Sequence, residues 1–243
     1  MTEWREENLG GVPTLRPGNL PPGLIVAFSG RGAALSGEPS PTAHLAARLA
    51  AALGLDGTPI VRATQVHGNR AVTLRQTPPE GTVTDAGECD ALATDRAGLA
   101  LVVQTADCVP ILLAAGRTLA AVHAGWRGSA SEATGAGVRA LTDLGARPEE
   151  IDAWLGPSIG ICCYEVGGEV ASRFAGDFVG RDCSGKYRLD LRGVNRAQLE
   201  AEGIPASRIS IHPACTCCGG ERYASYRRDG AAAGRMIALV ARL

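Results

Sequence analysis

The chain has 243 residues, of which 45% are hydrophobic and 20% are charged, and its formal net charge is −1. This composition indicates a globular protein with a sizeable core and excludes a disordered chain. The near-neutral charge argues against a nucleic-acid surface, and no stretch reaches the roughly 18 apolar residues of a membrane helix.

The N-terminal segment, residues 1–22, begins with charged residues and lacks the apolar stretch of a secretory signal. We therefore expect a cytoplasmic protein with a partly flexible N-terminal extension. In a reducing compartment the eight cysteines stay free for packing, metal binding or chemistry.

The first half of the chain reads mostly as strands. An alanine- and leucine-rich run predicts a helix at 42–53 that ends at Gly54, and 77–88 is expected to be a loop. Short apolar runs predict six strands, at 24–29, 59–64, 71–75, 99–105, 109–115 and 118–124.

The second half mixes both element types. Helices are expected at 129–145, 168–176 and 192–203, and strands at 151–156, 208–214 and 235–243. This mixture predicts an α/β (α+β) fold, and we expect one domain over residues 1–243.

The chain has only four histidines. His44 lies in the helical alanine-rich run and His212 precedes Pro213, so structural or surface roles are expected for both. His67 and His123 each lie where a strand-like run ends, and Cys108 lies at a polar break between two such runs.

Loops at strand ends converge on one edge of a sheet, so His67, Cys108 and His123 are candidates to meet. Two imidazoles and one thiolate suit Zn²⁺, and three protein ligands leave the open position of a catalytic site. The alternative is a buried thiol beside two hydrogen-bonded histidines.

The sequence after His123 predicts a tight turn and an anion site. Gly125 and Gly128 permit the turn, and Ser129 is expected to cap the next helix. Free N–H groups at that helix start and the Arg127 guanidinium would attract phosphate or carboxylate. The alternative for Arg127 is a solvated turn arginine.

Four acidic residues are considered as candidates for proton transfer. Asp90 and Glu165 are candidates for general acid or base catalysis, whereas a cap or ion-pair role is expected for Asp95 and Asp107.

The cysteines at 162, 163, 215, 217 and 218 have spacings unlike the two CxxC pairs of a zinc finger. Small buried thiols are therefore favoured there over a structural zinc site.

Six segments occur in an order that resembles a known family: TQVHG, ECDALATD, TADCVPILL, AAVHAGWRG, GPSIGICCYEVG and YASYRRDG. They resemble the YfiH-like, laccase-domain proteins over residues 24 to 240. These are labelled polyphenol oxidases or peptidoglycan editing factors, and are described as purine nucleoside phosphorylases with adenosine deaminase activity. The resemblance implies a layered sandwich like the catalytic domain of cytotoxic necrotizing factor, with zinc held by His67, Cys108 and His123.

The resemblance also bears on the substrate pocket. The expected substrate- or phosphate-binding residues are Arg31, Gln65, Arg127 and Arg227. The family begins closer to FSTRxGGVS, whereas this chain has FSGRGAALS, so the loop after Arg31 is shortened and alanine-rich.

The leading hypothesis is a zinc-dependent purine nucleoside enzyme. It would cleave adenosine, inosine or methylthioadenosine with phosphate and would deaminate adenosine, with Cys108, Glu165 and Asp90 as the catalytic candidates. Zinc would lower the pKa of water for attack on adenine, and arginines would hold phosphate against the ribose. A monomer is favoured, with purine nucleosides and phosphate as its only expected partners.

Three alternatives remain. A Cys108–His123 pair could act as a hydrolase on a cell-wall precursor. A copper oxidase of phenols is disfavoured because four histidines and two methionines are too few for a copper cluster, although copper could replace zinc. A binding module without catalysis is the last alternative.

Overall fold

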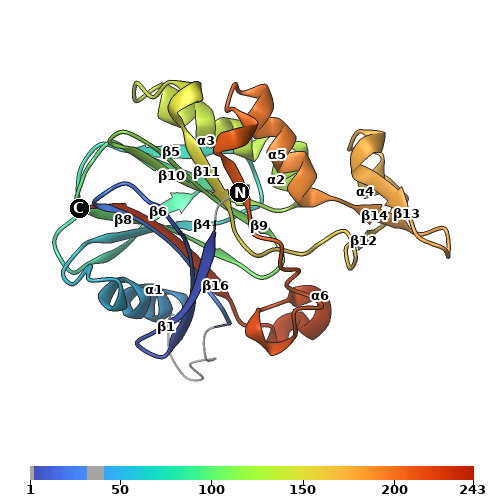
Figure 1. Cartoon of the computed structure of the whole chain (residues 1–243), viewed down its shortest axis with the longest axis horizontal. Coiled ribbons are helices and arrows are strands. Elements are labelled where there is room, and N and C mark those ends of the chain that lie inside the picture. The colour runs from blue at the N-terminus through green and yellow to red at the C-terminus, as the bar shows by residue number, and fades with distance from the viewer. Residues whose placement is uncertain (1–2, 32–40) are drawn as a thin grey trace.

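Two large β-sheets lie face to face, and a small third sheet projects from one side of them (Figure 1). The computed structural model describes residues 3–31 and 41–243. The first sheet has the order β1 (Trp4–Leu9), β2 (Val12–Pro17), β3 (Leu24–Ser29), β16 (Met236–Arg242), β8 (Leu99–Thr105), β4 (Ile60–Thr64) and β6 (Val83–Glu88). The second sheet has the order β15 (Ile209–Ile211), β11 (Asp152–Leu155), β9 (Val109–Ala115), β10 (Thr118–Ala124), β7 (Ala91–Thr94) and β5 (Ala71–Leu74).

The small sheet and the helices complete the described chain. The small sheet has the order β12 (Glu165–Val166), β14 (Tyr187–Leu189) and β13 (Val179–Arg181). The helices are α1 (Pro41–Ala52), α2 (Trp126–Ala130), α3 (Ala133–Thr142), α4 (Gly168–Ala171), α5 (Leu191–Ala201) and α6 (Tyr226–Asp229). None of the helices in the described part of the chain is both long and apolar enough to cross a membrane.

The sheets form the middle two of four layers because their central strands are apolar on both faces. Leu101 of β8 packs between the sheets against Leu112 of β9, while the next residue, Val102, packs outward with Leu49 of α1. On the other outer face, Val122 of β10 packs in the cluster that includes residues of α3 and α5. Strands buried on both faces read as continuous apolar runs, as the sequence has at β8, β9 and β10.

The strands at both edges of the first sheet were not predicted. Residues 4–17, placed in the N-terminal extension, form the antiparallel hairpin of β1 and β2 at the edge of the first sheet. Residues 83–88, expected to lie in a loop, form β6, which pairs in parallel with β4. The side chains of β6 are mostly exposed, so its sequence carries no apolar alternation.

The helix predicted at 129–145 is also different. It is divided into α2 and α3 at Glu132, whose φ of 63° is left-handed. The prediction that Ser129 caps a helix is wrong, because α2 begins at Trp126 with Gly125 as its N-cap. Ser129 instead lies inside α2, buried, where its hydroxyl bonds Asn195 of α5.

Candidate metal centre and cavity

His67, Cys108 and His123 converge at one end of the second sheet. Their three potential ligand atoms all lie within 4.8 Å of one another. The two imidazole rings are 4.8 Å apart between centroids and nearly perpendicular, at 80°. Two nitrogens and one thiolate at this spacing fit a zinc ion with one open position.

Strand register brings Cys108 and His123 together. In the antiparallel pair of β9 and β10, Val109 lies opposite Ala124 and Pro110 opposite His123. Cys108 immediately precedes β9, so it meets the end of β10 where His123 lies. The turn from β8 to β9 delivers Cys108 by passing from the first sheet to the second, through Asp107 with a φ of 88°.

Asp90 positions the two histidines of the site through hydrogen bonds. Its carboxylate accepts N–H bonds from His67 at 3.0 Å and Gly68 at 2.7 Å, which fix the loop that follows β4. It also contacts Nδ1 of His123 at 2.8 Å, so Nε2 is the ring nitrogen left for a metal. A carboxylate behind a ligating histidine fixes the orientation of the ring.

The protonation states of Cys108 and His123 bear on metal binding in opposite ways: a thiolate is ready to bind a metal, whereas a protonated imidazole must first lose its proton. Burial acts to raise the pKa of Cys108, but hydrogen bonds with His123 and His67 outweigh it and lower this pKa to about 6. Burial acts to lower the pKa of His123, but Asp90 and Cys108 raise it to about 9. Burial likewise acts to raise the pKa of Asp90, and its hydrogen bonds with His123 and with the backbone of Gly68 and His67 lower it below its usual range. Cys108 is therefore a thiolate at neutral pH, the form that binds metals.

Two glycines let the backbone approach the site. A Cβ on Gly125 would lie 2.8 Å from Cδ2 of His67 and 3.0 Å from Sγ of Cys108. A Cβ on Gly128 would lie 2.9 Å from the carbonyl oxygen of Gly68. The glycines of the GWRG segment therefore make room for the ligands, in addition to permitting a bend.

A cavity of about 490 Å³ opens onto the three candidate ligands. This volume lies within the usual range of small-molecule sites. Its lining is His67, Cys108 and His123 with Gln65, Gln104, Thr105, Ala106, Asp107, Trp126, Arg127, Ile159, Tyr164, Tyr226, Arg227 and Arg235.

Three arginines give the cavity a positive wall. Arg127 stacks on the ring of Trp126, with 4.4 Å from its guanidinium carbon to the ring centroid. Arg227 donates to the carbonyl oxygen of Glu165 at 2.8 Å, and Arg235 lies on the same lining. Such guanidinium groups suit a phosphate.

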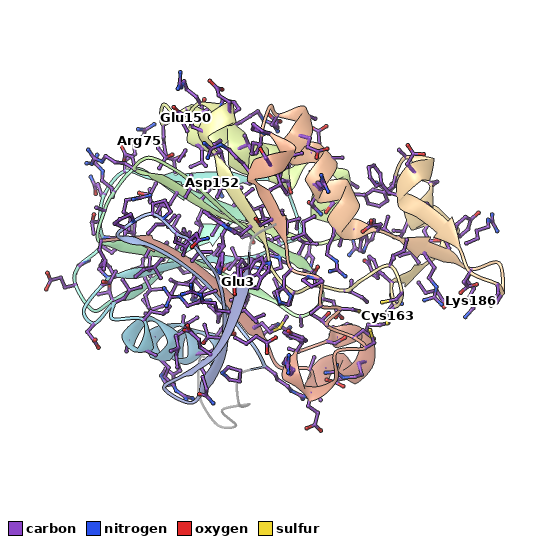
Figure 2. All side chains as sticks on the ribbon, viewed as in Figure 1. Glu3, Arg75, Glu150, Asp152, Cys163 and Lys186 are labelled. Atoms are coloured by element: carbon purple, nitrogen blue, oxygen red, sulfur yellow. The ribbon has the colours of Figure 1, made fainter. Side chains whose placement is uncertain are left out.

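The structure brings some of the predicted residues to this cavity and leaves others outside its lining. Gln65 and Arg227 line it together with Arg127. Glu165 instead pairs with Lys186 at 3.0 Å on the small sheet, whose outer part carries Lys186 in Figure 2. Arg31 lies 3.4 Å from Asp229, and the loop that follows it, residues 32–40, lies outside the described residues.

Sequence reasoning missed Tyr164, Tyr226 and Arg235 as residues of the cavity. Tyr164 and Tyr226 belong to the family-like segments GPSIGICCYEVG and YASYRRDG, and Arg235 lies five residues after the second of them, so these segments were the available signal. Asp107, for which a cap or an ion pair was expected, accepts a backbone N–H in the first turn of α6 and also lines the cavity. One carboxylate oxygen accepts the hydroxyl of Thr216 at 2.5 Å and the other accepts the N–H of Arg227 at 2.6 Å.

The other histidines and cysteines also have clear positions. His212 is buried against Trp4, with ring centroids 5.0 Å apart, and His44 is exposed on α1, as expected. The preference for small buried thiols is wrong for Cys162 and Cys218, which are exposed.

A larger hollow of about 870 Å³ lies elsewhere, between the N-terminal hairpin and residues 206–213. Its lining includes Trp4, Trp154 and the Arg208–Asp152 ion pair, but none of the predicted site residues. The residues present therefore favour the smaller cavity as the functional site.

Comparison with known proteins gives a consistent result. Residues 31–243 match the family model described as multi-copper polyphenol oxidoreductase laccase. A purine nucleoside phosphorylase of Deinococcus radiodurans is 38% identical, over 95% of this chain and 93% of that protein. An adenosine deaminase from an unknown prokaryotic organism is 36% identical, over 77% of this chain and 76% of that protein. The crystal structure of YlmD from Geobacillus stearothermophilus superposes with a TM-score of 0.84 at 29% identity, over 100% of this chain and 99% of that one.

Proposed function

This chain belongs to the family described as multi-copper polyphenol oxidoreductase laccase, and we propose that it is a zinc-dependent purine nucleoside enzyme. It would cleave purine nucleosides with phosphate and deaminate adenosine. The observation that carries the proposal is the His67–Cys108–His123 set at the base of a cavity with three arginines on its wall. The names of the relatives support the substrate class.

In phosphorolysis, Arg127 and Arg227 would hold phosphate beside C1′ of the ribose. A phosphate oxygen forms a bond to C1′ while the bond from C1′ to N9 breaks, and the electron pair leaves with the purine. Positive charge develops on the sugar, so a bound phosphate dianion stabilises the transition state electrostatically. The departing purine gains one proton, which balances the proton that the phosphate dianion loses when it forms the ester.

Tyr164 is our candidate for a hydrogen-bond donor to the purine or the phosphate. Burial raises its pKa to about 12, and the nearby charge of Cys108 adds to that rise. The phenol therefore keeps its proton at neutral pH. It lies on the cavity wall next to Arg227, whose guanidinium carbon is 5.4 Å from its ring centroid.

Deamination needs water to attack C6 of adenine and ammonia to leave. A zinc ion held by His67, Cys108 and His123 would act as a Lewis acid that lowers the pKa of water beside the purine. The role we propose for Asp90 is positioning: its carboxylate is buried behind the ligands and already accepts three backbone N–H groups.

A second candidate is a hydrolase that uses Cys108 as the nucleophile and His123 as its base, acting on a cell-wall precursor. The observation in its favour is the lowered pKa of Cys108 beside His123. A thiolate that binds zinc cannot also attack substrate freely, so the two functions exclude each other at this site. Copper oxidation of phenols stays disfavoured, because the chain has four histidines and two methionines.

The test is product analysis by chromatography on adenosine, with and without phosphate. The native protein should yield adenine only with phosphate, and inosine in either case. Cys108→Ala should lose both products with its fold intact, while Cys183→Ala, at an exposed thiol outside the site, should keep both. Unchanged products from Cys108→Ala would overturn the proposal.

Other expectations from the sequence stay predictions. They are the likeness to the catalytic domain of cytotoxic necrotizing factor, the monomeric state, the cytoplasmic location and the binding of copper in place of zinc.

A further inference from the structure

Four cysteines from two distant parts of the chain meet outside the cavity. Cys162 and Cys163 follow β11, and Cys215 and Cys218 follow β15. Their four Sγ atoms all lie within 4.8 Å of one another. Figure 2 labels Cys163 near the base of the projecting β12–β14 sheet.

Backbone contacts hold the two segments side by side. Ser158 and Cys215 form an isolated parallel bridge, in which the N–H of Thr216 donates to the carbonyl of Ser158 at 3.1 Å. The N–H of Gly160 donates to Sγ of Cys215 at 3.2 Å. Backbone N–H groups aimed at sulfur stabilise the negative charge of a thiolate.

The sulfur spacing suits one tetrahedral ion. Sγ of Cys162 and Sγ of Cys218 are 3.8 Å apart. A tetrahedron with metal–sulfur bonds of about 2.3 Å has edges of roughly 3.8 Å. A disulfide needs about 2.05 Å. A [4Fe–4S] cluster binds each thiolate to a different iron atom, and a [2Fe–2S] cluster binds them as two pairs on two iron atoms, so both hold the four sulfurs farther apart than a single ion does.

We propose that Cys162, Cys163, Cys215 and Cys218 bind a zinc ion in a closed site, distinct from the one at the cavity. Four thiolates complete the tetrahedral shell and leave no position for substrate, so this zinc is structural. The exposure of Cys162 and Cys218 gives the ion a path from solvent. The proposal goes beyond the proposed function and does not depend on it.

The ion would stabilise the wall of the cavity that Tyr164 and Arg227 line. Tyr164, next to Cys163, lines that cavity. Thr216, between two of the cysteines of the second segment, donates to Asp107, which also accepts the N–H of Arg227. Joining the two segments through a metal would therefore hold Tyr164 and Arg227 in position.

The test is metal content per chain, measured by mass spectrometry after gel filtration. Cys108→Ala removes a ligand of the cavity site and should leave one zinc per chain. Adding Cys162→Ser or Cys218→Ser to it should remove that zinc. The matched control is Cys217→Ser in the same background, because Cys217 lies beside the ligands in sequence but outside the group of four, and it should keep the ion.

Two results would overturn the proposal. One is a Cys108→Ala protein that retains no metal, and the other is an unchanged metal content after Cys162→Ser. If the double variants fail to fold, the Cys108→Ala protein alone decides. Titrating its thiols with a mercurial should release one zinc ion, detected by a chromogenic chelator, and a titration that releases none contradicts the site. Cobalt substitution of the same protein should give the intense thiolate charge-transfer bands of a four-thiolate site.

Discussion

Asp90 is the residue that does most to fix the geometry of the candidate metal ligands. It joins the His67 loop to the ring of His123 through one fully buried carboxylate. An asparagine has the same shape but offers one oxygen, and its NH₂ group would face backbone donors. We therefore expect Asp90→Asn to weaken zinc affinity by roughly 10- to 100-fold.

A competition titration with a chromogenic chelator measures that affinity. The result separates positioning from proton transfer, since loss of a proton carrier lowers the rate and leaves zinc affinity unchanged. Native zinc affinity with a reduced rate in Asp90→Asn would therefore contradict the positioning role.

Gly125 offers a test of the space around the ligands. In Gly125→Ala the new methyl group would overlap His67 and Cys108, so the ligands must move apart. We expect the free energy of unfolding to fall by about 1–3 kcal/mol, together with weaker zinc binding. Gly176→Ala is the control, because a Cβ there meets nothing within 4 Å. Equal zinc affinity in the two variants would show that the close approach is unimportant.

At the scale of elements, α2 presents Arg127 to the cavity. Arg127→Gln removes a charged group from the proposed phosphate site, and a charge-assisted hydrogen bond contributes about 1.5–3 kcal/mol. The KM for phosphate should rise by roughly 10- to 100-fold while deamination of adenosine continues. The control is Arg173→Gln, because Arg173 is exposed and lies farther than Arg127 from the Trp126 ring. This variant should leave the KM for phosphate and the deamination of adenosine unchanged. A similar KM in both variants would argue against a phosphate contact by Arg127.

The sequence predicted best those strands whose apolar pattern follows directly from burial. Strands β8, β9 and β10 match their predicted ranges because each is almost entirely buried and is mostly apolar. Strand β6 has no such pattern, since its pairing with β4 and not its side chains makes it a strand. The split at Glu132 depends on one left-handed residue that the helical pattern does not reveal.

In the site, too, some residues could be predicted from the sequence and others come together only through the packing of loops. The candidate ligands His67, Cys108 and His123 were predicted from their positions at strand ends and from the family resemblance, and the structure brings them together. The gathering of Cys162 with Cys218 was not predicted, because it depends on how two loops pack and their spacing matches no metal motif. Tyr164 lies in one of the family-like segments but was missed, because a tyrosine in a loop carries no signal of burial of its own.

At the scale of the whole molecule, His212 makes stability depend on pH. It is buried against Trp4, and its Nδ1 accepts the N–H of Ala214 at 3.2 Å, which requires the neutral ring. Burial lowers its pKa to about 4, from 6.5 in an unfolded chain. Above pH 6.5 both states are neutral and this contribution is complete. Below it only the unfolded chain gains the proton, so stability falls until about pH 4.

This one group should lower the free energy of unfolding by about 3 kcal/mol between pH 6.5 and pH 4. Urea unfolding at several pH values measures the slope. The variant His212→Phe keeps the aromatic contact and should flatten the slope in that window, after allowance for any change in overall stability. An equal slope in the native protein and in His212→Phe would exclude His212 as the cause.

The two sheets and their helices form a layered α/β architecture like that of YlmD, and His67 and Cys108 lie in the two turns where the chain passes from one sheet to the other. The single domain expected over residues 1–243 stays a prediction. The central claim is that this architecture supports a metal-requiring reaction on purine nucleosides.

The most direct measurement is conversion of adenosine by the native protein before metal removal, after removal, and after zinc is restored. Adenine that requires phosphate and inosine that does not should both disappear with the metal and return with zinc. Conversion that survives complete removal of the metal, or no conversion by the zinc-loaded protein, would contradict the account. The second result would favour hydrolysis by Cys108 and His123.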